Sequence, residues 1–140
     1  MRDQPLLLLS ILAGDLLCQR TGPNVCQPRD ISEHYTFAGM TNYVVSQQKH
    51  IRFYNTVLEV SSVCSVEGTK QYYKIIFTIA PTYCNSRIKY DSLVCKPITT
   101  EAIGKCLAFV KGEPSDHQWN VTYFACAAPD QPDTVLSPKA

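Results

Sequence analysis

Cysteines are the residues of this sequence whose chemistry and spacing carry the most information. Four of them lie in the second half of the chain, at Cys84, Cys95, Cys106 and Cys126. The first two enclose ten residues, the last two enclose nineteen, and both pairs lie in stretches with the pattern of β-strands and turns. We therefore expect two successive local disulfides. A zinc site is not expected, because it would need short Cys-x2-4-Cys clusters, and seven residues separate Cys18 from Cys26.

The length and composition of the chain are those of one small globular domain. A chain of 140 residues can form one hydrophobic core but not two. Hydrophobic residues make up 45% of it, charged residues 18%, and the formal net charge is +1. This balance argues against a disordered tail protein and against nucleic-acid binding, which needs a basic face.

The N-terminus has the features of a secretory signal peptide. Arg2 precedes an apolar run over residues 6–13, which is too short to span a bilayer and is soon followed by Asp15. We therefore expect secretion and no membrane anchor, with residues 1–18 as the signal and residues 19–140 as the mature domain. The cleavage point is left open. Seven cysteines in so short a chain also indicate an oxidising, extracellular compartment.

One amphipathic helix is predicted over residues 31–48. Asp30 has Glu33 three residues after it, which is a variant of the capping box. Apolar residues then recur at helical spacing in two sets, Ile31, Tyr35 and Ala38, and Phe37, Met40 and Val44. Such a helix must bury its apolar stripe against another element.

After this helix the hydrophobic period changes to two, which is the period of a β-strand. Strands are predicted over residues 53–60, 72–79, 106–111 and 119–125. The first two are joined by a polar segment that contains Gly68, and the last two by a turn cluster that contains Gly112 and Pro114. A helix followed by antiparallel strands is an α+β layout, with the helix packed on one face of the sheet.

This order of elements, with its two cysteine pairs, resembles the type 2 cystatins and most closely the secreted cystatins of ticks. The resemblance covers about Gly22 to Cys126. Its most specific parts are the cysteine spacing and four runs of sequence, at residues 55–60 (NTVLEV), 68–73 (GTKQYY), 90–97 (YDSLVCKP) and 123–126 (YFAC). The resemblance implies the cystatin fold, in which a five-stranded antiparallel sheet wraps around one long α-helix and an N-terminal arm supplies the first strand.

The resemblance also implies a function, which is reversible, non-covalent inhibition of papain-like cysteine proteases such as cathepsins. In the family an N-terminal arm and two hairpin tips enter the active-site cleft, and no cofactor is needed. The first tip reads Gln-x-Val-x-Gly in the family, and here it reads Cys64, Ser65, Val66, Glu67 and Gly68. Val66 can fill an apolar subsite and Gly68 can adopt a positive φ. The lost glutamine and the added carboxylate of Glu67 imply weaker or narrower inhibition.

The second tip and the N-terminal arm match the family's residues only in part. Many family members have Pro-Trp at the second tip, and the matching residues here are Pro114 and Ser115. Loss of the tryptophan removes a large aromatic anchor. We expect Trp119, which follows closely, to pack on the domain itself. Gly22 is a candidate for the flexible glycine of the arm.

Cys26 and Cys64 are left over after the two expected disulfides. In a cystatin-like fold the arm runs beside the first tip, so these two residues could form a third disulfide; the alternative is that both thiols are free. Asn120 begins an Asn-Val-Thr glycosylation sequon.

No group of residues indicates an enzyme, because none of the three histidines has a nucleophile elbow, a phosphate loop or clustered carboxylates around it. Two function hypotheses remain. The first is a secreted inhibitor of papain-like proteases, with host cathepsins as targets by resemblance to tick saliva proteins. The second is a cystatin-fold binding or immunomodulatory module that has lost most of its inhibition. We expect a monomer, and a domain-swapped dimer is left open.

Overall fold

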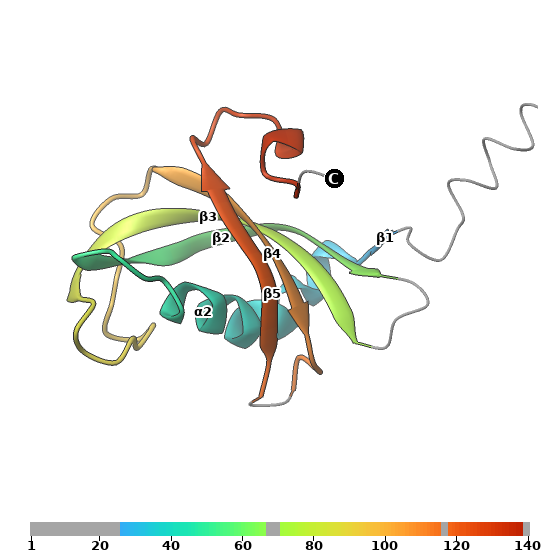
Figure 1. The fold of residues 1–140 in the computed structure, drawn as a ribbon, viewed down its shortest axis with the longest axis horizontal. Coiled ribbons are helices and arrows are strands. Elements are labelled where there is room, and N and C mark those ends of the chain that lie inside the picture. Colours follow the sequence, from blue (N-terminus) through green and yellow to red (C-terminus); the bar gives the residue numbers. More distant parts are fainter. Residues whose placement is uncertain (1–25, 67–70, 116–117, 139–140) are drawn as a thin grey trace, which may run out of the picture.

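A computed structural model describes residues 26–66, 71–115 and 118–138 of the chain. The elements, in chain order, are β1 (Cys26–Pro28), the 3-10 helix η1 (Ile31–Phe37), α2 (Ala38–Ser46), β2 (Phe53–Val66), β3 (Tyr72–Asn85), β4 (Gly104–Lys111), β5 (Asn120–Ala127) and the 3-10 helix η2 (Asp133–Val135). The five strands form one antiparallel sheet in the order β1-β2-β3-β4-β5. The sheet curves around α2, which lies across its concave face (Figure 1). The predicted α+β fold is confirmed.

The helix differs from its prediction in its first half. Residues 31–37 form a 3-10 helix, and the α-helix begins only at Ala38. Ile31 and Tyr35 are each 78% exposed, so the prediction that they share the apolar stripe is wrong. A 3-10 helix has three residues per turn, and residues four apart therefore do not share a face. The buried stripe consists of Phe37, Met40, Thr41, Val44 and Val45.

The predicted capping box does not form. Asp30 is the N-cap residue of η1, but its side chain makes no capping hydrogen bond. Glu33 instead forms an ion pair with Arg29, with 2.6 Å between Nη2 and Oε2. An exposed pair four residues apart contributes little to stability, so the helix depends on its packing against the sheet.

The core lies between the helix stripe and the concave face of the sheet. Strand β3 keeps strict alternation, and Tyr73, Ile75, Phe77 and Ile79 all face the core. Strand β2 does not, because its register against β3 shifts at three places, after Phe53, Val57 and Val60. Bulges of this kind turn side chains from one face to the other. The core-facing residues of β2 are therefore irregularly spaced, at Tyr54, Thr56, Val57, Val60 and Val63.

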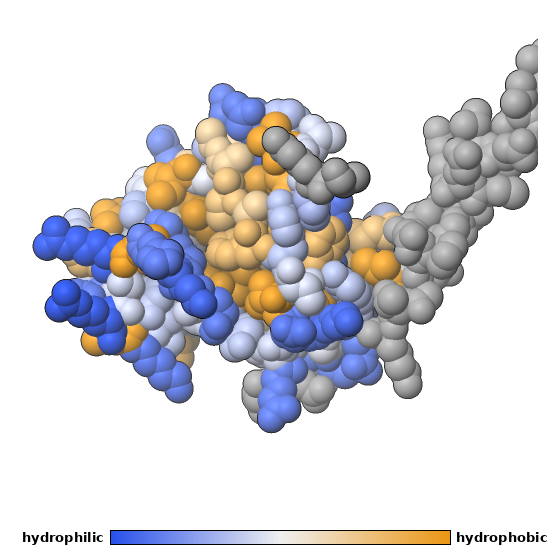
Figure 2. Space-filling view, in the orientation of Figure 1, coloured by the Kyte–Doolittle hydropathy of each residue, from blue (hydrophilic) through white to orange (hydrophobic). Residues whose placement is uncertain are grey.

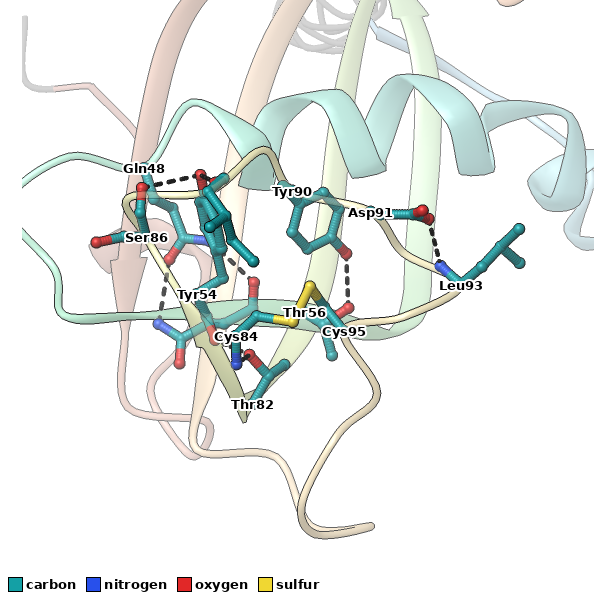
Figure 3. The surroundings of a disulfide bond; sticks show 12 residues. Gln48, Tyr54, Thr56, Thr82, Cys84, Ser86, Tyr90, Asp91, Leu93 and Cys95 are labelled. Atoms are coloured by element: carbon teal, nitrogen blue, oxygen red, sulfur yellow. Dashed lines mark hydrogen bonds between the residues drawn. A yellow bond between two sulfur atoms is a disulfide. The ribbon is translucent and has the colours of Figure 1, made fainter.

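The two expected disulfides form. Cys84 is bonded to Cys95, with 5.5 Å between their Cα atoms, and Cys106 is bonded to Cys126, with 4.1 Å. Figure 3 shows the first bridge beside the buried hydrogen bond between Thr56 and Tyr90, whose hydroxyl oxygens lie 2.6 Å apart. This bridge fixes the long connection between β3 and β4 to the end of the sheet.

The C-terminal segment, which the sequence analysis left without structure, covers part of the convex face of the sheet. Leu136 is 1% exposed and packs against Ile76 and Leu107. The Tyr123 hydroxyl donates to the Leu136 carbonyl at 2.7 Å, and Lys105 pairs with Asp133 at 2.7 Å. The sheet therefore has apolar packing on both faces.

Candidate functional site

The N-terminal arm lies beside the end of the first hairpin. Strand β1 pairs antiparallel with the last residues of β2, with Cys26 opposite Val66 and Pro28 opposite Cys64. The Arg29 amide then donates to the Val63 carbonyl at 2.7 Å. Strand β1 therefore lies beside the last residues of β2, at the right of Figure 1.

A third disulfide links the arm to this hairpin. Cys26 is bonded to Cys64, with 5.3 Å between their Cα atoms and a sequence separation of 38. Both residues are half-buried. The crosslink therefore occupies the position at which the related first-tip motif has a glutamine.

The second hairpin is bonded directly to the first. The Gly112 amide donates to the Gln71 carbonyl at 2.8 Å, and the Gln71 side-chain amide donates to the Glu113 carboxylate. Gly112 has a φ of 137°, and a Cβ atom there would lie 2.7 Å from Cδ1 of Trp119. Only glycine fits this position without strain. We call residues 26–28, 64–66, 71 and 112–115 together the three-segment edge.

Trp119 packs on the domain, as predicted. Its indole nitrogen donates to the Glu113 carbonyl at 2.6 Å, and its ring meets Tyr43 edge-on with 5.6 Å between centroids. A Cβ atom on Gly39 would lie 3.5 Å from the indole. The ring therefore joins the second hairpin to α2. It does not substitute for the tryptophan of the Pro-Trp motif, whose position is taken by Ser115. Ser115 itself is exposed, and Pro114 before it is half-buried.

The charged groups near the edge act on one buried tyrosine. Burial is the main cause that raises the pKa of Tyr73 above its usual value. The carboxylates of Glu113 and Glu33 raise this pKa further, and Arg29 lowers it. Tyr73 also packs edge-on against Phe37, with 4.9 Å between ring centroids, which fixes the start of β3 to the helix.

The predicted site residues that the structure describes lie at the same end of the sheet. Cys64, Ser65 and Val66 end strand β2, and Pro114 and Ser115 follow the turn at Gly112. The predicted residues Gly22, Glu67 and Gly68 lie outside the described residues. Asn120, the glycosylation candidate, is the exposed first residue of β5.

Sequence reasoning missed Gln71 and Glu113, which connect the hairpins. They are 42 residues apart, and no local pattern signals their contact. Within the described ranges, no three His, Cys, Asp or Glu side chains gather in a way that could hold a metal ion.

Comparisons with known proteins point to one family. No family model matches the chain. Cystatin-1 of Ornithodoros moubata is 29% identical over 127 residues, which is 86% of this chain and 95% of that protein. Mialostatin of Ixodes ricinus is 28% identical over 97 residues, or 67% of this chain and 69% of that protein.

Solved structures agree with the sequence relatives. The crystal structure of Mialostatin, a gut cystatin from the hard tick Ixodes ricinus, superposes with a TM-score of 0.65 at 26% identity, covering 75% of this chain and 99% of that one. The salivary cystatin from the soft tick Ornithodoros moubata gives a TM-score of 0.64 at 25% identity, covering 76% and 99%. The chain is thus similar in sequence to cystatins of ticks and shares the fold of their solved structures.

Proposed function

We propose that this protein is a secreted, reversible and non-covalent inhibitor of papain-like cysteine proteases. The observation that carries the proposal is the three-segment edge. The arm is crosslinked to the first hairpin, and the first hairpin is hydrogen-bonded to the second. Three segments that are distant in sequence thus form one continuous border, and we propose that this border enters the protease cleft.

The proposed mechanism is exclusion of substrate. Val66 at the end of β2 and Pro114 after β4 contribute apolar surface to the edge, and a few well-packed anchors of this kind can supply most of the binding energy of an interface. Because the disulfide and the Gln71–Gly112 hydrogen bond hold the segments before binding, little ordering is needed when the complex forms. No covalent step with the protease is required.

The altered tips lead us to propose narrower selectivity than that of a cystatin with the complete motifs. Cys64 is bonded to Cys26, so it cannot offer the polar contact of a glutamine. Glu67 brings a carboxylate into a tip that must lose water on binding, which is costly without a cationic partner. A protease with a basic residue near this subsite would be the best target.

We further propose that residues 1–18 direct secretion and that host cathepsins are the targets. One relative is a salivary cystatin and another is a gut cystatin, each from a tick. No helix in the described part of this chain is long and apolar enough to span a membrane. We expect the monomer to be the inhibitory form.

Titration of the mature domain, residues 19–140, against cathepsins L, B, C and S tests the proposal. Competitive inhibition of at least one of them is expected, and Val66→Asp should weaken it by at least about tenfold. Val135→Asp is the matched control, because Val135 is 54% exposed in η2, outside the three-segment edge.

A lack of inhibition at micromolar concentration would contradict the proposal. It would favour the alternative function, a cystatin-fold binding or immunomodulatory module with weak or lost inhibition. Equal losses in the two aspartate variants would show that the three-segment edge is not the contact surface.

A further inference from the structure

The end of the sheet opposite the three-segment edge has a different character. Phe53, the first residue of β2, pairs with Asn85, the last residue of β3. Strand β2 has 14 residues, so the path along it from one end to the other is about 43 Å at about 3.3 Å per residue. The connections at this far end lie at the left of Figure 1, away from β1.

This far end concentrates positive charge. Residues 47–53 and 85–90 contain four Lys or Arg residues and no Asp or Glu; the four are Lys49, Arg52, Arg87 and Lys89. The net charge of the whole chain is +1, so the remainder carries +1 − 4 = −3. We call residues 47–53 and 85–90 the cationic end. Figure 2 shows strongly hydrophilic side chains gathered at this end.

In the part of the chain that the structure describes, none of the four cations of this end forms an ion pair. The ion pairs found among the described residues, Arg29 with Glu33 and Lys105 with Asp133, lie elsewhere. Arg52 has its guanidinium 5.4 Å from the ring centroid of Phe53, its own neighbour, which restricts the side chain without neutralising it. The charge of the cationic end is therefore available to an external anion.

Hydrogen bonds hold the two connections of the cationic end together. The Ser86 amide donates to the Arg52 carbonyl at 3.0 Å, and the Ser86 hydroxyl donates to the Ile51 carbonyl at 2.5 Å. The Tyr54 hydroxyl donates to the Ile88 carbonyl at 2.7 Å. Figure 3 shows Tyr54 and Ser86 close to the bridge between Cys84 and Cys95. The backbone of the two connections that carry the cations is thus held in place before any ligand binds.

A hollow of about 570 Å³ lies between these connections. Its lining combines the guanidinium groups of Arg52 and Arg87 with the side chains of His50 and Asn85, which can donate hydrogen bonds. Guanidinium groups present paired donors that match the oxygens of sulfate and phosphate groups. The chemistry of the hollow therefore suits a tetrahedral oxyanion.

We propose that the cationic end binds a linear sulfated polysaccharide of the glycosaminoglycan class. One sulfate group would occupy the hollow between Arg52 and Arg87, and further sulfates along the chain would meet Lys49 and Lys89. A flexible polyanion can place single groups into a hollow, whereas the surface of a bilayer is flat and cannot enter one. A single sulfate ion could contact only part of this surface, so the four separate cations fit a ligand that carries several sulfate groups.

This site would leave inhibition untouched. Because the three-segment edge lies at the other end of β2, a protein held on a polysaccharide would still present that edge to a protease. The proposal thus adds a retention function, in which the inhibitor is concentrated on an extracellular matrix. It does not depend on the protease proposal.

Calorimetric titration of the full mature protein with a heparin-derived octasaccharide, at physiological salt, tests this inference. Arg52→Gln/Arg87→Gln should weaken binding by at least about tenfold, since two charge-assisted contacts are lost. Lys74→Gln/Lys111→Gln is the matched control. It removes the same charge from β3 and β4, outside the cationic end, and should change the affinity by less than about threefold. The arginine variant should inhibit cathepsins as the unaltered protein does.

Four results would overturn the inference. The first is the absence of octasaccharide binding. The second is an equal loss in both double variants, which would indicate only diffuse attraction. The third is tighter binding to phosphatidylserine vesicles than to the octasaccharide, which would indicate a membrane ligand. Inorganic sulfate at the same sulfate concentration should compete poorly, and full competition by it would reduce the site to one for a small anion.

Discussion

The disulfide between Cys26 and Cys64 gives the sharpest prediction about stability. It is the longest-range of the three bridges, with a separation of 38 residues against 11 and 20 for the others. A crosslink stabilises a fold chiefly by restricting the unfolded chain, and the effect grows with the length of the closed loop. The perturbation is the double variant Cys26→Ser/Cys64→Ser, which removes the crosslink and leaves the other two in place.

The expected magnitude follows from loop closure. For a separation of 38 residues the chain-entropy relation gives about 4 kcal/mol, against about 3 kcal/mol for 11 residues. Strand β1 has only three residues and pairs only with β2, so the arm can fray in the variant and recover some entropy in the folded state. We therefore expect a loss of between about 2 and 4 kcal/mol in the free energy of unfolding.

Urea unfolding followed by tyrosine and tryptophan fluorescence measures this loss. The same curves give the m-value, which should rise in the variant because the unfolded chain becomes more expanded. A loss under about 1 kcal/mol with an unchanged m-value would refute the reasoning. Peptide mapping without reductant is the control, and it should find Cys26 joined to Cys64 in the unaltered protein.

Three further predictions concern the second hairpin, pH and the C-terminal segment. Trp119→Phe removes the hydrogen bond to the Glu113 carbonyl and should lower the free energy of unfolding by about 1 kcal/mol. Inhibition should change by less than about threefold. A large loss of inhibition would mean that the indole contacts the protease. Burial raises the pKa values of Tyr73 and Tyr90, so the folded state holds these protons more tightly than the unfolded chain. The free energy of unfolding should therefore be level below pH about 10 and fall above it, and Tyr90→Phe should make that fall shallower; an equal slope in the variant would contradict this cause. Leu136→Ala should cost about 2 to 3 kcal/mol by thermal or urea unfolding, and a cost under about 0.5 kcal/mol would show that the C-terminal segment does not stabilise the sheet.

The strands and the two local bridges could be predicted because their signals are local. Period-two alternation is kept in the first part of β3, since its residues 72–79 pair in regular register with β4. Cys106 lies directly opposite Cys126, as the spacing around one hairpin would require. The family resemblance added the first strand, which has only three residues and no periodic pattern of its own.

Other features depend on contacts that the local sequence does not encode. The helix changes from 3-10 to α at Ala38. The spacing of the apolar residues is compatible with either hydrogen-bonding pattern, so it does not indicate where this change occurs. The bulges of β2 arise from pairing with β3 and bring Val57 into the core alongside Thr56. Leu136 stands among Pro and Asp residues, so only the folded sheet shows that it has a partner.

The same limit applies to the candidate site. The tip residues Val66 and Pro114 were found from a motif, and the Cys26–Cys64 bridge was one of two open alternatives. The contact between Gln71 and Glu113, which joins the tips, has no sequence signature. The hollow between Arg52 and Arg87 likewise requires that two connections meet at one end of the sheet.

Protection of the catalytic cysteine of cathepsin L from an irreversible active-site probe tests the central claim most directly. If the three-segment edge fills the cleft, labelling of the catalytic thiol should fall in proportion to the inhibitor added and should return when the complex is diluted. Continued labelling at saturating inhibitor, or protection that survives dilution and denaturation, would contradict reversible blockage of the cleft.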